Sequence, residues 1–241
     1  MNEGLVQQLI SELDDFGIVC ELSQARLMIR HLELLIEKNK VVNLTRITDP
    51  NDSVTLHLVD SLLPLSCKDV SVTENDRYLD LGTGGGFPGI PFGVMSKSHG
   101  VLIDSVGKKV DAVNSFIEEL GLKRLTALHT RVEDYALAHK GSQTIVLARA
   151  VAQTNVLVEY AAPLLSRGGL LLVQKGKPDQ DEVDAGVKAG ELCGMNLVSR
   201  ETFELPRDLG HREVLVFRKV DKPKLKLPRK AGVAKRNPLG V

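Results

Sequence analysis

The sequence contains no tryptophan and only three cysteines, Cys20, Cys67 and Cys193. None of them stands in a Cys-x-x-Cys pair, which argues against a zinc site and a disulfide framework and favours a reducing compartment. No apolar run approaches the roughly 20 residues that span a bilayer. The amino terminus is polar and acidic, unlike a signal peptide. We therefore expect a cytoplasmic protein with no membrane partner.

Acidic residues are nearly missing from the end of the chain. Lysine plus arginine and aspartate plus glutamate each number 31 over the 241 residues, yet the last 23 residues hold eight of the cations and one acid, Asp221. A basic tail on an acidic body predicts a polyanionic partner. A terminus that only increases solubility is the alternative.

Residues 78–89 contain the most informative motif, Tyr-Leu-Asp-Leu-Gly-Thr-Gly-Gly-Gly-Phe-Pro-Gly. It predicts a short strand, a glycine-rich turn that a ligand can approach closely, and a helix that starts near Pro88. Free N–H groups at such a helix start attract a carboxylate or phosphate. The dinucleotide fingerprint Gly-x-Gly-x-x-Gly would require glycine at Phe87, so that fingerprint is absent.

The spacing Asp-x-Gly-x-Gly-x-Gly, from Asp80 to Gly86, resembles motif I of class I S-adenosylmethionine (SAM) methyltransferases. That resemblance implies that the glycines contact the methionine part of SAM and that Asp80 lies near its amino group or a bound water. A tight strand–helix turn without a ligand is the alternative. Asp104, 24 residues further on, ends the apolar run 100–104, where doubly wound folds place an acid for ribose hydroxyls. It could instead cap the next helix, unless Ser105 or Gly107 starts that helix.

Hydrophobic periodicity predicts alternating strands and helices after an all-helical beginning. We expect helices over 3–15 and 23–38, with Ser23 capping the second, and another helix beginning at 49–52. Strands follow at 78–81, 100–104, 125–129, 143–148 and 169–173, with helices at 110–120, 155–165 and 179–192, and a closing pair of strands at 195–203 and 213–218. Continuously apolar strands in this order indicate an α/β fold with a parallel sheet covered on both faces.

Ligands of such sheets lie beyond the carboxyl ends of the strands. Asp80, Asp104, Arg149 and Lys175 all map there, from four different strands. His57 and Asp60 lie three residues apart on a helix and share a face. A surface pair, or a histidine satisfied by its neighbour, is the alternative for those two. No third ligand stands near them, so we expect no metal.

The motifs taken together resemble the RsmG (GidB) family of bacterial 16S ribosomal RNA guanine-N7 methyltransferases from about residue 20 to the end. The matching stretches are Val-Asn-Leu-Thr at 42–45, His-Leu-Val-Asp-Ser at 57–61, the glycine motif through 91, Asp-Ser-Val-Gly-Lys-Lys at 104–109, Arg-Val-Glu at 131–133, Arg-Ala-Val-Ala at 149–152, Lys-Gly at 175–176 and Leu-Pro-Arg-Lys-Ala-Gly at 227–232. Lys109 and Gln174 depart from the commonest family forms.

This resemblance implies a class I methyltransferase fold, Rossmann-like, with a mostly parallel seven-stranded sheet over residues 71–220. An N-terminal helical extension (1–70) would precede it and a basic tail (221–241) would follow. The implied SAM-binding residues are Asp80, Gly82, Thr83, Gly84, Gly86, Phe87, Asp104, Ser105, Val132, Glu133 and Arg149. Asp104 would hold the ribose with Ser105 close by, and Val132 and Glu133 would flank the adenine. Arg149 and Lys175, with His57 and Asp60, would face the RNA.

The chemistry expected from this family needs no general base, because N7 of guanine has a free lone pair and no proton to lose. The sequence has no Asn/Asp-Pro-Pro-aromatic motif after the fourth strand, as adenine-N6 enzymes have. It also has no cysteine placed as a pyrimidine-C5 nucleophile. We expect a monomer that acts on 16S rRNA or the small subunit. Removal of residues 221–241 should weaken RNA binding and spare SAM affinity. A small-molecule methyltransferase and a non-catalytic SAM-binding assembly factor are the alternatives.

Overall fold

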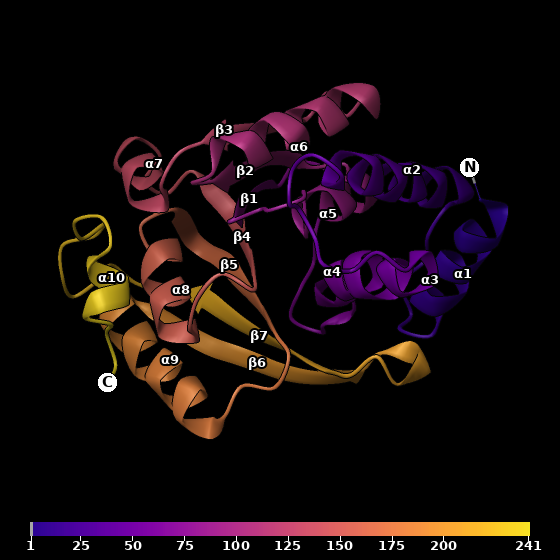
Figure 1. Ribbon diagram of the computed structural model, residues 1–241. Helices are drawn as coiled ribbons and strands as arrows, with labels where there is room; N and C mark the ends of the chain where they lie inside the picture. Colours follow the sequence, from indigo (N-terminus) through magenta and orange to yellow (C-terminus); the bar gives the residue numbers. More distant parts are fainter. Residues whose placement is uncertain (1) are drawn as a thin grey trace.

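The computed structural model describes residues 2–241. Its centre is a seven-stranded sheet in the order β3-β2-β1-β4-β5-β7-β6 (Figure 1). The first five strands run parallel and β7 is antiparallel to both of its neighbours. The strands are β1 (Arg77–Leu81), β2 (His99–Asp104), β3 (Leu125–His129), β4 (Gln143–Arg149), β5 (Leu165–Lys175), β6 (Met195–Glu204) and β7 (His211–Lys219). This is the mostly parallel sheet that the sequence predicts.

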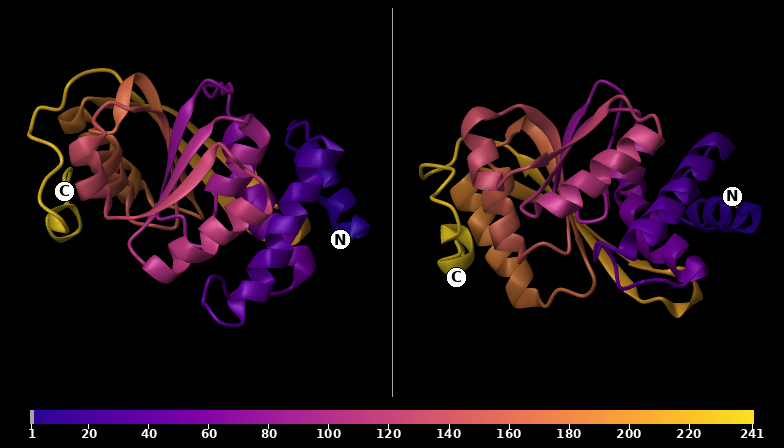
Figure 2. Two further views of the ribbon diagram at one scale, coloured as in Figure 1. Left: turned by 90° about the horizontal axis from the view of Figure 1, so that it is seen from above. Right: turned by 45° about the horizontal axis from the view of Figure 1, so that its top comes forward.

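Helices cover both faces of the sheet. The longer ones are α1 (Glu3–Asp14), α2 (Leu22–Asn39), α5 (Gly89–Ser96), α6 (Gly107–Glu119), α7 (Val132–Ala138), α8 (Thr154–Ala161) and α9 (Gln180–Cys193). Alternate residues of each strand enter different cores, as the pleat of a strand requires. Tyr78 packs in the core beneath α1, α2, α5 and α6, whereas Leu79 packs in the core beneath α7, α8 and α9. Figure 2 shows the sheet between these two layers.

The N-terminal helices share a core with the sheet. Val6, Leu9 and Leu13 of α1 belong to the same buried cluster as Phe116 of α6. The second helix begins one residue earlier than predicted, because Glu21 and Gln24 form a reciprocal capping box there. The predicted cap, Ser23, is therefore wrong, and its hydroxyl bonds to Glu21 instead.

The helix predicted from 49–52 exists but changes type along its length. Asp49 caps α3 (Pro50–Ser53), a π-helix follows over Val54–Val59, and α4 spans Asp60–Leu62. The wider turn of the π-helix directs residues 57–61 toward the protein interior. His57, Asp60 and Ser61 are all buried. A π turn within a helix often marks a functional site.

The hairpin of β6 and β7 reaches back to the N-terminal helices (Figure 1). At its tip, Arg207 donates to Asp52 Oδ1 at 3.1 Å and to the Asn51 carbonyl at 2.8 Å. Phe203 contacts Phe16 edge to face at 6.0 Å between ring centroids. These contacts hold the helices beside the carboxyl ends of the strands.

The boundaries of the elements follow the predictions closely, except that the helix predicted at 155–165 ends at Ala161. Two further features were not predicted. The sequence did not predict α7, and β5 begins four residues earlier than expected, at Leu165. The last strand is followed by residues 220–241, which carry a short helix, α10 (Val233–Arg236), on the outside of α8. Within residues 2–241, no helix is both long and apolar enough to cross a membrane.

Candidate cofactor and substrate cavities

The glycine loop between β1 and α5 is held against the end of β2. The amides of Gly82 and Thr83 donate to the Ile103 carbonyl at 2.9 and 3.0 Å, and the Gly84 amide donates to Asp104 Oδ2 at 3.0 Å. Gly82, Gly84 and Gly86 all have positive φ, as the motif predicts. A Cβ on Gly82 would lie 2.8 Å from the Val151 side chain, so only glycine fits there.

Asp80 lies beneath this loop and is fully buried. Its Oδ2 accepts the Gly89 amide at 3.0 Å, at the start of α5. Burial raises the pKa of Asp80 to about 6, although the hydrogen bond from the Gly89 amide opposes this rise. Asp80 Oδ1 and Thr83 Oγ1 have no hydrogen-bond partner within residues 2–241. Unpaired buried polar atoms beneath a glycine loop are what a polar ligand would satisfy.

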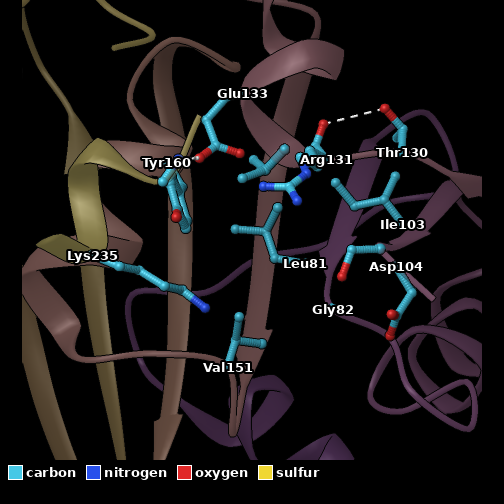
Figure 3. Close-up of a pocket in the computed structure, with 13 residues that line it drawn as sticks. Leu81, Gly82, Ile103, Asp104, Thr130, Arg131, Glu133, Val151, Tyr160 and Lys235 are labelled. Atoms are coloured by element: carbon cyan, nitrogen blue, oxygen red, sulfur yellow. Dashed lines mark hydrogen bonds between the residues drawn. The ribbon is translucent and has the colours of Figure 1, made fainter. Parts of the chain in front are cut away.

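A cavity of about 220 Å³ opens beside the loop and is drawn in Figure 3. Gly82, Asp104, Ser105, Val132 and Glu133, all predicted to bind SAM, line it. Asp104 accepts the amides of Gly84 and Val106 and so also fixes the loop after β2. The helix after β2 begins at Gly107. An acid, apolar walls and backbone donors fit a nucleoside, so these residues suit SAM. We call this space the cofactor cavity.

A second cavity, of about 470 Å³, is lined by His57, Asp60, Arg149 and Lys175. These are the four residues predicted to face the RNA, and they come from the π-helix segment, β4 and β5. Arg212, from β7, and Gln174 complete its polar lining. We call this space the substrate cavity.

Asp60 forms ion pairs with two arginines in the substrate cavity. Arg149 Nη1 donates to its Oδ2 at 3.0 Å, and Arg212 Nε lies 3.2 Å from its Oδ1. Arg149 Nη1 also donates to the Leu56 carbonyl at 3.0 Å, inside the π turn. The Gln174 amide donates to the Asp60 carbonyl. One carboxylate thus aligns two guanidinium groups toward the same space.

Phe87 stacks between two histidines. Its ring centroid lies 4.6 Å from that of His31 and 4.7 Å from that of His57, and Arg149 Cζ lies 5.6 Å from the centre of the Phe87 ring. Burial lowers the pKa of His31 to about 4. Burial, with the positive charges of Arg149 and His31, lowers the pKa of His57 to about 3. Both imidazoles are therefore neutral at pH 7.

The carboxyl end of β4 separates the two cavities. Arg149 and Ala150 line the substrate cavity, whereas Val151 lines the cofactor cavity. Ala150 has φ of +56°, an uncommon conformation for a residue with a Cβ. This turn directs adjacent side chains to opposite sides, which explains why Arg149 lies on the substrate side.

Lys175 lines the substrate cavity, but its ammonium is already paired. Nζ donates to the Ala152 carbonyl at 2.7 Å and lies 2.6 Å from Glu182 Oε1. Glu182 also accepts the amide and hydroxyl of Thr154. Lys175 therefore fastens the β4–α8 loop to α9, a role that the sequence did not indicate.

The structure divides the predicted residues between the two cavities, and Arg149, which was predicted both to bind SAM and to face the RNA, lines the substrate cavity. Asp80, Thr83, Gly84, Gly86 and Phe87 belong to the loop and its packing but do not line the cofactor cavity. Sequence reasoning missed Arg212 and Tyr160, which line the substrate and cofactor cavities respectively, because no motif surrounds either. It also missed Gly232 and Lys235 of the tail, which line the cofactor cavity.

Comparison with known proteins identifies the family. The model of the GidB family, rRNA small subunit methyltransferase G, matches residues 24–209. The chain belongs to this family. It is 37% identical over 238 residues to ribosomal RNA small subunit methyltransferase G of Desulfitobacterium hafniense, covering 97% of this chain and 98% of that protein. It is 34% identical over 236 residues to the protein of the same name in Lactobacillus acidophilus, again covering 97% and 98%.

Solved structures agree with the fold. A putative transferase from Pyrococcus horikoshii superposes with a TM-score of 0.52 at 14% identity, over 62% of this chain and 59% of that one. Precorrin-6y C5,15-methyltransferase from Geobacter metallireducens gives 0.52 at 9% identity, over 66% and 86%. The class I methyltransferase fold predicted from the sequence is confirmed. As a member of the rRNA small subunit methyltransferase G family, the protein is a SAM-dependent rRNA methyltransferase.

Proposed function

We propose that this member of the methyltransferase G family transfers the methyl group of SAM to N7 of one guanine in 16S rRNA, as a cytoplasmic monomer. The arrangement of the two cavities supports this proposal most directly. The cofactor cavity and the substrate cavity lie on the two sides of the chain at the end of β4, because Arg149 lines the substrate cavity and Val151 lines the cofactor cavity. A base held in one would therefore lie near a methyl donor held in the other.

SAM, when bound, supplies an electrophilic methyl carbon on a sulfonium sulfur. Asp104 and Ser105 would hold the ribose, and Val132 and Glu133 would flank the adenine, in the cavity that all four line. The amide-rich glycine loop and the unpaired Oδ1 of Asp80 suit the amino-acid end. The protein's contribution is placement of the reacting atoms and exclusion of water.

The substrate cavity contains no group suited to remove a proton. His57 has a pKa of about 3, which makes it a very weak base, and Asp60 accepts a hydrogen bond from Arg149 and forms an ion pair with Arg212. Guanine N7 needs no deprotonation before attack, whereas an exocyclic amine loses a proton on methylation. The cavity therefore favours N7 chemistry. Arg149, held by Asp60 and the Leu56 carbonyl, would orient the base or its phosphate.

Methyl transfer to isolated small subunits tests the proposal. Subunits from cells lacking this protein would be incubated with labelled SAM and the enzyme, and the product nucleoside identified. We expect one N7-methylguanosine per subunit, and none with subunits from cells that contain the enzyme. A different methylated base would contradict the N7 assignment. SAM binding without transfer to any form of 16S rRNA would favour the assembly-factor alternative.

Sedimentation of the purified protein tests the monomer assignment. Naked 16S rRNA, assayed beside assembled subunits, would identify the form of the substrate. Turnover of small molecules without RNA would instead support the small-molecule alternative.

A further inference from the structure

The C-terminal segment, residues 220–241, is packed on the methyltransferase domain. After β7, the amides of Val220 and Asp221 donate to the Gly194 carbonyl, and the Lys224 amide donates to the Leu192 carbonyl at 2.8 Å. Leu227 and Ala234 are buried in the core formed by α8 and α9. Figure 1 shows this yellow segment beside those two helices.

Two side chains of α8 hold the segment. Glu159, which is 3% exposed, accepts Arg229 Nε at 2.7 Å, and Arg229 Nη2 bonds to its other oxygen. Arg229 Nη2 also donates to the Asn237 carbonyl at 2.9 Å. Asn155 Nδ2 donates to the Leu239 carbonyl at 2.8 Å. The segment is therefore fixed on both sides of α10.

This anchoring brings α10 to the cofactor cavity. The Gly232 amide donates to Glu133 Oε1 at 2.8 Å, so the tail is joined to the residue predicted to flank adenine. Gly232 and Lys235 line the cavity together with Val132 and Tyr160. Figure 3 shows the Lys235 side chain extended, with its ammonium directed into the cavity between Tyr160 and Val151. Within residues 2–241, no ion pair or hydrogen bond engages that ammonium.

We propose that the C-terminal segment forms one wall of the cofactor site and that Lys235 donates a hydrogen bond from it to the adenosine part of SAM. This inference rests on the proposed function only for the identity of the cofactor. It reverses the expectation that removal of residues 221–241 spares SAM affinity, because that expectation treated the tail as separate from the cavity. The Lys235 ammonium can donate N–H hydrogen bonds, and the nitrogens and oxygens of a nucleoside can accept them.

Calorimetric titration with S-adenosylhomocysteine, without RNA, tests this directly. Lys235→Ala should weaken binding roughly tenfold, as expected for loss of a charge-assisted hydrogen bond at a partly open site. Lys226→Ala is the matched control, because Lys226 is an exposed lysine of the same segment that does not line the cofactor cavity. We expect that control to bind like the wild type. Both lysines are exposed, so neither change should disturb folding, which a melting curve would check.

A second variant tests the wall itself. Glu133→Gln keeps an oxygen acceptor for the Gly232 amide, whereas Glu133→Ala removes it. Only the alanine variant should therefore release the tail from the wall at Gly232, while the contacts with α8 still hold the rest of the segment. Faster cleavage of the tail by trypsin in Glu133→Ala would report that release. Unchanged affinity in Lys235→Ala would overturn the proposal for Lys235, and unchanged cleavage in Glu133→Ala would overturn the role of Glu133 in holding the tail as a wall of the cavity. If the wild type binds neither SAM nor its product, the cofactor assignment itself fails, which is a distinguishable result.

Discussion

At the residue scale, the position of Arg149 says most about how a substrate could be held. It emerges from β4 on the substrate side, and Asp60 and the Leu56 carbonyl fix one of its nitrogens. Only Nη1 is bonded to the protein within residues 2–241, so Nε and Nη2 can donate to RNA. Removing a residue that positions a substrate often lowers the reaction rate about a hundredfold.

Arg149→Ala should therefore lower methyl transfer about a hundredfold and leave the affinity for S-adenosylhomocysteine within about threefold. Single-turnover assays on subunits and calorimetry would measure the two effects. Arg212→Ala is the matched control, since Arg212 contacts the same carboxylate. Full activity in Arg149→Ala would show that Arg149 does not position the substrate. Equal losses in both variants would attribute the effect to Asp60.

Phe87 shows how a residue can serve the site without lining a cavity. It is 6% exposed and stacks on His31 and His57. Phe87→Ala should lower the free energy of unfolding by about 3 kcal/mol, because it leaves a cavity between two rings. Urea titration would measure this, and Phe87→Leu should lose less. Equal stability of the alanine variant would mean that the stack contributes little.

At the scale of elements, the ion pair between α8 and the C-terminal segment has the clearest energetic consequence. Glu159 and the Arg229 side chain are 3% and 18% exposed. Removing one member of a buried pair leaves the other charge without compensation and typically costs about 3 kcal/mol. Glu159→Ala should destabilise the protein by about that amount.

A double-mutant cycle with Arg229→Ala checks this result. The double variant should lose clearly less stability than the two single losses added together, since neither charge is then left alone. Strict additivity would mean that the two side chains do not interact energetically. Urea titrations of the four proteins at pH 7 supply all the values.

At the scale of the whole molecule, three buried titratable groups with large pKa shifts make the stability depend on pH in acid. The pKa values of His31 and His57 lie near 4 and 3, below the ordinary 6.5, so the unfolded state binds more protons than the folded state below pH 6.5. Acid therefore removes stability through both. The pKa of Asp80 is raised to about 6, so acid adds stability through it between pH 6 and 4.

The two histidines lose stability in acid and Asp80 gains it, so these three groups together should lower the free energy of unfolding by about 3 kcal/mol between pH 6.5 and 4.5. In His31→Phe one of these groups is gone, and the fall should be about 2 kcal/mol smaller. Urea titrations across this range would measure both proteins. Parallel pH profiles would show that His31 does not titrate as burial requires.

The RNA contacts should show themselves in salt dependence. Lys222, Lys224 and Lys226 are exposed on the C-terminal segment. If they neutralise phosphates, replacing all three with glutamine should reduce the slope of log affinity against log salt by about 2 to 3 for subunit RNA. Affinity for S-adenosylhomocysteine should not change. An unchanged slope would exclude these lysines from the RNA interface.

The local sequence alone determines the order of the strands and helices and most of the candidate site residues. The strand and helix order follows from hydrophobic periodicity, because apolar runs and amphipathic stretches specify elements independently of their neighbours. Asp80, the three alternating glycines and Asp104 predicted a cofactor site for the same reason, since their spacing is local. His57, Asp60, Arg149 and Lys175 were found through motifs, and the structure gathers them around one cavity.

Only the tertiary structure decided how those residues pair and what else joins them. Lys175 pairs with Glu182 because α9 packs against α8 and β6, and Asp60 aligns Arg149 with Arg212 because β7 pairs with β5. No local pattern encodes either arrangement. The π turn that turns His57 inward depends on packing rather than on helix propensity. The basic tail looked like a free arm from its composition. Leu227, Ala234 and Arg229 instead hold it beside the cofactor cavity, because burial and charge pairing are settled by elements distant in sequence.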